Sequence, residues 1–237
     1  MTPGGNRPGQ RRLVLVTRPE PGASETAAGL AALGLIPVLA PMLTIRPLPV
    51  RLPPHVVAVL AASSNALPPL PPSLHGLPLL AVGDATAARA VAAGFTNVCS
   101  ADGDAVALAG LAARTLPAGA AILLAAGAGQ GASLVADLRA CGFRVHRRTV
   151  YAARPVRTLP DSARLALAGQ DLLAVLFMSA ETARAFVRAL PVALRPALAG
   201  VQALAIGRPA AEVVMHLPWR GVRVSAKPTM VSLMALL

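Results

Sequence analysis

The chain alternates short apolar runs of strand length with Ala- and Leu-rich segments of helical length. The pattern begins with a strand at residues 13–16, a helix at 24–33 and a strand at 36–39, and it continues to the C-terminus. Such alternation is typical of βαβ units, in which helices join parallel strands and cover the sheet. The sequence therefore predicts an α/β protein built on parallel sheets.

The remaining elements follow from the same pattern. Further strands are expected at residues 56–60, 79–82, 97–99, 121–124, 144–146, 173–177, 203–206 and 221–224. Further helices are expected at residues 85–93, 104–114, 133–140, 161–168, 180–190 and 209–216, and from 229 onward. Gly34, Gly94 and Gly142 are expected to close three helices, because glycine readily adopts positive φ. Asp161 and Thr229 are expected N-caps.

Two proline-containing stretches, at residues 41–51 and 149–160, interrupt this rhythm. Each lies between complete βα groups, so both are expected to be linkers. This predicts two α/β domains: a discontinuous outer domain (1–46 plus 155–237) and an inserted middle domain (47–150). A single large sheet is the alternative.

The composition predicts a folded protein without a membrane span. Hydrophobic residues make up 55% of the chain and charged residues 14%, which excludes wholesale disorder. The longest uncharged stretches, 52–83 and 115–136, are interrupted by prolines and by glycines respectively. The first apolar run, 13–16, is too short for a signal peptide. We therefore expect a cytoplasmic protein.

Cysteine and histidine give no sign of a metal or cofactor site. Cys99 and Cys141 lack CxxC spacing and are expected to be buried thiols. The four histidines are scattered, with neither metal-ligand spacing nor a triad signature. We therefore expect no metal and no cofactor.

The net charge of +12 favours an anionic partner. It is spread along the chain, with +3 in residues 1–46 (5 Arg, 2 acids), +3 in 47–150 (7 Arg, 4 acids) and +6 in 151–237 (9 Arg, 1 Lys, 4 acids). There is no basic tail, and only four Phe, one Tyr and one Trp are available to stack on bases. Nucleic acid is therefore not expected to be the partner.

Small, polar or glycine-containing turns follow nearly every expected strand. They lie at residues 17–22, 63–65, 83–86, 126–131, 179–182 and 207–209. In parallel α/β sheets such turns lead into helix N-termini, whose free N–H groups bind anions. The alternative for each Ser or Thr is a plain helix cap. The turn at 127–131 lacks GxGxxG spacing and a following Lys-Ser/Thr, so it supports no nucleotide site.

Several segments, in order, resemble the uroporphyrinogen-III synthase family. They are VLVTRPEPGASETAAGLAALGLIPVLAPMLTIRPL (14–48), LPLLAVGDATAARAVAAGF (77–95), SADGDA (100–105), RRTVYAARP (147–155), VLFMSAETARAF (175–186) and AKPT (226–229). The resemblance implies a monomer of two flavodoxin-like α/β lobes joined by a two-stranded linker. It also implies a cofactor-free reaction on hydroxymethylbilane: loss of water, inversion of ring D through a spirocyclic intermediate, and closure to uroporphyrinogen III. A transient contact with the preceding pathway enzyme is a further expectation.

The resemblance also suggests site residues. Tyr151, in the second linker, matches the family's linker tyrosine and is the candidate to assist loss of water, although it could simply pack in a linker strand. Matching substrate-binding positions are Arg18, Ser63, Ser64, Asn65, Gly83, Asp84, Thr86, Ser179, Thr182, Lys227 and Thr229. The sequence departs from the family's pattern in two places. The prolines after Leu67 forbid a regular helix there, and the turn at 127–131 has no basic residue.

Two other functions compete with the synthase. A non-catalytic two-lobed α/β binding module would hold an anionic ligand without reacting it, but a generic binder has no reason to share these segments in this order. The hypothesis of an RNA-associated protein rests only on the net charge, and RNA binding of this kind would have to weaken steeply as the salt concentration rises.

Overall fold

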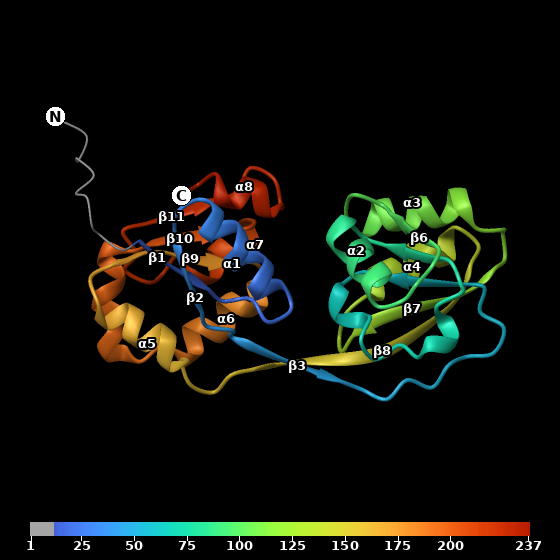
Figure 1. Ribbon diagram of the computed structural model, residues 1–237, viewed down its shortest axis with the longest axis horizontal. Coiled ribbons are helices and arrows are strands. Elements are labelled where there is room, and N and C mark those ends of the chain that lie inside the picture. Colours follow the sequence, from blue (N-terminus) through green and yellow to red (C-terminus); the bar gives the residue numbers. More distant parts are fainter. Residues whose placement is uncertain (1–11) are drawn as a thin grey trace. The chain divides into compact units, whose positions relative to one another are not determined.

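The structure is a computed structural model that describes residues 12–237 (Figure 1). Contacts between residues divide it into two compact units. We call Met1–Thr44 with Arg154–Leu237 the outer unit, and Ile45–Ala153 the inserted unit. The chain thus passes from one unit to the other twice, in strands β3 (Leu43–Pro47) and β8 (Arg144–Pro155).

The outer unit is built on a five-stranded sheet of order β11-β10-β9-β1-β2, in which every pair is parallel. Its strands are β1 (Leu13–Val16), β2 (Ile36–Leu39), β9 (Leu172–Phe177), β10 (Gln202–Ala205) and β11 (Gly221–Val224). Its helices are α1 (Gly22–Ala32), α5 (Asp161–Ala168), α6 (Ala180–Ala189), α7 (Arg208–Val214) and α8 (Met230–Met234), with a 3₁₀ segment η3 (Val192–Gly200).

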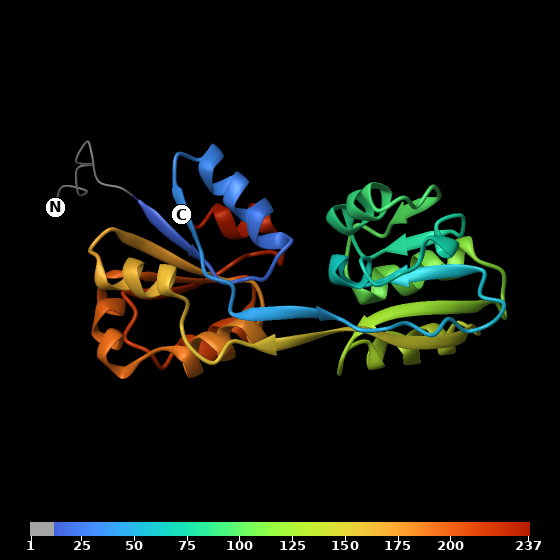
Figure 2. The ribbon, with the colours of Figure 1, turned by 60° about the horizontal axis from the view of Figure 1, so that its bottom comes forward.

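Helices lie on both faces of the outer sheet (Figure 2). α1 and α8 pack on one face, where Leu30 and Leu233 meet the buried side chains of β1 and β9. α5 and α6 lie on the opposite face (Figures 1 and 2). Because both faces are covered, the central strands can be almost wholly apolar. The edge strands β2 and β11 are more exposed.

The inserted unit contains a six-stranded sheet of order β3-β8-β7-β4-β5-β6. Its other strands are β4 (Ala58–Ala61), β5 (Leu79–Ala81), β6 (Val98–Ser100) and β7 (Ala121–Gly127). Its helices are α2 (Asp84–Ala92), α3 (Ala105–Thr115) and α4 (Ala132–Ala140), with 3₁₀ turns η1 (Ser64–Ala66) and η2 (Pro72–Leu74). One core packs under α2 and the 3₁₀ turns, and the other packs under α3 and α4.

Five strands of this sheet are parallel, and β3 is antiparallel to β8. The Leu48 N–H donates to the Val150 carbonyl, whereas the Val156 N–H donates to the Met42 carbonyl. As the residue number rises in one strand it falls in the other, which is the antiparallel pattern. The two crossings between units are therefore hydrogen-bonded to each other.

The expected α/β alternation is confirmed, and most elements differ from expectation only at their ends. Gly34, Gly94 and Gly142 have φ of +72°, +102° and +88°, as expected for helix ends. The proline-rich segment after Asn65 forms no regular helix, and it runs from the 3₁₀ turn η1 to the 3₁₀ turn η2.

Three expectations were wrong. Asp161 is the first residue of α5, and its N-cap is Pro160. Both cysteines are exposed, since Cys99 lies on edge strand β6 and Cys141 is the C-cap of α4. β8 was expected over residues 144–146 but spans twelve residues. Its segment RVHRRT has no apolar run, and its strand conformation comes from pairing with β7.

Within residues 12–237, no helix is both long and apolar enough to cross a bilayer. In the same range, no three or more His, Cys, Asp or Glu side chains are grouped so that they could hold a metal ion.

Candidate active site

The turns after the parallel strands gather at one edge of each sheet, which we call the carboxyl edge. In the inserted unit, Ala61 pairs with Ala81 and with Ala125, so β4, β5 and β7 reach this edge together. The turns that follow β4 and β5 contain Ser63 and Gly83, and Gly127 is the last residue of β7. Tyr151 of β8 lies there too, because it pairs with Gly127. The predicted residues of this unit thus share one edge.

A β-bulge places Tyr151. Thr149 pairs with Ala126 and Tyr151 pairs with Gly127, so Val150 is an extra residue on β8. A bulge changes the alternation of side chains along a strand. Val150 and Tyr151 are accordingly both buried, and the Tyr151 side chain is only 3% exposed. Its hydroxyl donates to Gln130 Oε1 at 2.8 Å.

The close approach of Tyr151 to β7 requires glycine at position 127. A Cβ built on Gly127 would lie 2.7 Å from Tyr151 Cζ and 2.7 Å from Gln130 Oε1. Such distances are well below van der Waals contact. The absence of a side chain at Gly127 thus makes room for the ring and for its hydrogen-bond partner.

Arg147 of β8 holds the glycine-rich turn (residues 127–131). Its Nε donates to the Gln130 carbonyl at 2.8 Å, and a terminal guanidinium nitrogen donates to the Gly127 carbonyl at 3.3 Å. The turn was noted for lacking a basic residue, and the neighbouring strand supplies one. Sequence reasoning missed Arg147 and Gln130 because their contacts depend on the pairing of β7 with β8.

The other predicted residues of the inserted unit sit at helix starts. Ser63 is the N-cap of η1 and accepts from the Asn65 N–H at 3.3 Å, and Ser64 begins that turn. Gly83 is the N-cap of α2, and Asp84 lies in its first turn. Thr86 is 7% exposed and its N–H donates to the Gly83 carbonyl. Ser63 therefore has a capping role whatever else it does.

The outer unit has its own carboxyl edge. Ser179 follows β9 and caps α6 by accepting from the Thr182 N–H at 3.1 Å. Thr229 caps α8, and the Lys227 N–H donates to Ser232 Oγ at 3.2 Å.

Arg18 follows β1, the strand next to β9 in the outer sheet. Its guanidinium packs against Gly22 in the first turn of α1 and lies 3.5 Å from Thr26 Oγ1. Thr26 Oγ1 in turn lies 3.8 Å from Met230 Sδ of α8. The starts of α1 and α8 therefore meet beside Arg18.

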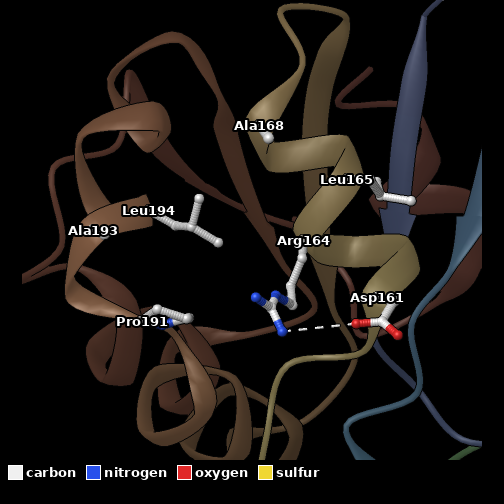
Figure 3. Close-up of a pocket in the computed structure, with 7 residues that line it drawn as sticks. All are labelled: Asp161, Arg164, Leu165, Ala168, Pro191, Ala193 and Leu194. Atoms are coloured by element: carbon white, nitrogen blue, oxygen red, sulfur yellow. Dashed lines mark ion pairs between the residues drawn. The ribbon is translucent and has the colours of Figure 1, made fainter.

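The outer unit also contains a groove between α5 and η3 (Figure 3). Its volume is about 640 Å³, and Leu165, Pro191 and Leu194 contribute to its lining. Arg164 points into this space and lies 3.8 Å from Asp161 (Figure 3). None of the predicted site residues lines the groove, which belongs wholly to the outer unit.

Except for Arg18, the predicted site residues at the two carboxyl edges lie within a match to a known family. A sequence model described as Uroporphyrinogen-III synthase HemD matches residues 24–235. The chain belongs to this family. The resemblance identified in the sequence is thus confirmed, and with it membership of a family of hydro-lyases.

Solved structures of uroporphyrinogen-III synthases share the fold. The synthetase from Helicobacter pylori aligns with a TM-score of 0.62 at 17% identity, over 95% of this chain and 97% of that one. A mutant synthase from the extremely thermophilic bacterium Thermus thermophilus aligns with a TM-score of 0.50 at 22% identity, over 95% and 97%. At these identities the likeness establishes the two-sheet α/β fold. A comparison with curated protein sequences found no significant match.

Proposed function

We propose that this member of the uroporphyrinogen-III synthase family converts hydroxymethylbilane to uroporphyrinogen III. The family match over residues 24–235 carries the proposal. In the reaction the hydroxymethyl C–O bond breaks, and the hydroxyl leaves with a proton as water. The freed methylene carbon bonds to the substituted α-carbon of ring D and gives the spirocyclic intermediate. The older bridge bond to that carbon then breaks and re-forms at the free α-carbon of ring D, whose hydrogen is lost as a proton, so that the macrocycle closes with ring D inverted. The pyrrole nitrogens supply the electrons that expel the hydroxyl. The protein then has to assist the leaving oxygen and hold the bilane folded.

Tyr151 is our candidate to assist the leaving oxygen. A phenol is both donor and acceptor of hydrogen bonds and can act as a general acid. The buried ring, the bulge and the contact with Gln130 hold the phenolic oxygen in one place. For the hydroxyl to leave, the phenolic hydrogen turns from Gln130 to the departing oxygen. The aromatic ring does not have to move for this exchange.

Substrate binding rests on charge and on helix N-termini. The substrate carries eight carboxylates, and the protein carries a net charge of +12. In the inserted unit the start of α2 offers backbone N–H groups, and in the outer unit the start of α6 does the same. We propose that carboxylates bind at these starts and at Arg18. The remaining proposed contacts are Ser63, Ser64, Asn65, Gly83, Asp84, Thr86, Ser179, Thr182, Lys227 and Thr229.

The proposal extends to the setting of the reaction. We propose a cofactor-free monomer that acts in the cytoplasm and meets the preceding pathway enzyme only transiently. The unpaired, exposed Cys99 and Cys141 support a reducing compartment.

The test is to give the purified protein freshly generated hydroxymethylbilane without any cofactor. The products are then oxidised, and the type I and type III porphyrin isomers are separated. Spontaneous closure gives type I, so an excess of type III supports both catalysis and ring inversion. A folded protein that binds the bilane but yields only type I would instead be a non-catalytic anion-binding module.

A further inference from the structure

We propose that Gln130 is a positioning residue for Tyr151, an inference that rests on the proposed function. The chain contains a single tyrosine, and the hydroxyl of its buried side chain donates to Gln130 Oε1 at 2.8 Å. Gln130 itself is exposed, on the glycine-rich turn. A surface side chain thus supplies an acceptor for a buried phenol.

The backbone around Gln130 is held in a specific conformation. Gly129 and Gly131 have φ of +73° and +82°, a region that residues with a side chain rarely adopt. The Gln130 N–H donates to the Gly127 carbonyl at 3.1 Å, and the Gln130 carbonyl accepts from Arg147 at 2.8 Å. The turn is therefore tied both to itself and to β8, so the amide of Gln130 reaches the phenol from a defined backbone.

A second contact ties the turn to the strand that carries the tyrosine. The Ala128 N–H donates to the Tyr151 carbonyl at 2.9 Å, while the Tyr151 hydroxyl donates to Gln130. The turn thus contacts both ends of the tyrosine residue. Misplacement of a reacting group by about 1 Å can cost on the order of 100-fold in rate. The Gln130 amide fixes the phenolic oxygen until the hydroxyl of the substrate replaces it as acceptor.

The experiment compares two substitutions of similar size. Gln130→Met keeps the length of the side chain and removes the acceptor, whereas Gln130→Glu keeps an acceptor oxygen. Gln170→Met is the matched control, because Gln170 is also an exposed glutamine but lies in the outer unit. Initial rates are measured with hydroxymethylbilane, and kcat and KM are obtained separately for each variant.

We expect Gln130→Met to lower kcat about fivefold, roughly the effect of one hydrogen bond, with KM little changed. Gln130→Glu should restore most of the rate, and Gln170→Met should behave as the wild type. In a Tyr151→Phe background, Gln130→Met should cause no further loss of kcat, because the effects of two substitutions that remove the same contact are not additive. A merely structural role would instead give the same loss in both backgrounds and overturn the proposal, as would a wild-type or raised kcat in Gln130→Met.

A second readout does not depend on activity. The Raman Fermi doublet of tyrosine reports whether the phenol donates a hydrogen bond, and Tyr151 is the only tyrosine in the protein. The doublet should change in Gln130→Met and stay close to wild type in Gln130→Glu. An unchanged doublet in Gln130→Met refutes the contact itself. If the wild-type protein makes no type III isomer, but the doublet still changes in Gln130→Met, then the proposed function is refuted and the contact is not.

Discussion

Gly127→Ala tests whether the fit between β7 and Tyr151 matters to the reaction. The new methyl group would lie 2.7 Å from Tyr151 Cζ, 2.9 Å from Cε2 and 2.7 Å from Gln130 Oε1. Ordinary carbon contacts are about 3.5–4.0 Å, so the ring has to retreat by about 1 Å. Displacement on that scale predicts a fall in kcat of about ten- to a hundredfold. Overpacking should also lower the free energy of unfolding by about 1–3 kcal/mol.

The assay for Gly127→Ala is the initial rate of type III formation, with urea unfolding measured in parallel. Gly76→Ala is the matched control, because a Cβ at Gly76 meets no atom within 4 Å. The control should keep wild-type rate and stability. If folded Gly127→Ala turns over as fast as Gly76→Ala, then the position of the Tyr151 ring is not important for catalysis and the reasoning fails.

Three further predictions concern single side chains. Tyr151→Phe should lower kcat by about ten- to a hundredfold while the protein stays folded, as judged by circular dichroism; an unchanged rate removes Tyr151 from the mechanism. Asp104→Ala removes the side chain that accepts from the Val106 and Ala107 N–H groups at the start of α3. Urea unfolding should show that the free energy of unfolding falls by about 1 kcal/mol. Asp137 is exposed, and Asp137→Ala serves as the control, whose free energy of unfolding should change little. Phe186→Leu removes a fully buried ring that lies 5.3 Å from the Phe177 ring and 6.0 Å from that of Trp219, centroid to centroid. The substitution should lower the free energy of unfolding by about 1–3 kcal/mol. Urea unfolding is monitored by the fluorescence of Trp219, the only tryptophan; a wild-type urea midpoint would show that the site repacks without loss.

The strands and helices were predictable where burial imposes a periodic pattern. The apolar runs of β1, β7 and β9 are covered on both faces, so their sequences indicate strands directly. β8 was mostly missed because its polar residues take strand conformation from pairing with β7, which leaves no local pattern. Cys99 was misjudged for a related reason, since an edge position is a property of the whole sheet.

Individual residues of the candidate site could be predicted from the sequence, but the contacts between them could not. Turns after strands and the linker tyrosine could be found from the sequence. The contact between Tyr151 and Gln130 could not, because it depends on the bulge at Val150 and on the missing side chain of Gly127. The capping roles of Ser179 and Thr229 follow from helix starts, which the pattern did locate.

The pairing of β1 also has a consequence for synthesis on the ribosome. β1 lies between β2 and β9, and Leu13 pairs with Leu172. The outer sheet therefore cannot close until β9 has been made, whereas the inserted unit is one continuous stretch, Ile45–Ala153. Domains fold as they emerge, at about 5–20 residues per second. Stalled nascent chains that have exposed β8 but not β9 should resist protease across the inserted unit and remain sensitive in residues 12–44; equal sensitivity of both regions would refute this order. β1 thus gains its second neighbour, β9, only after the whole inserted unit has been made, so the inserted unit begins after the outer unit and is completed before it.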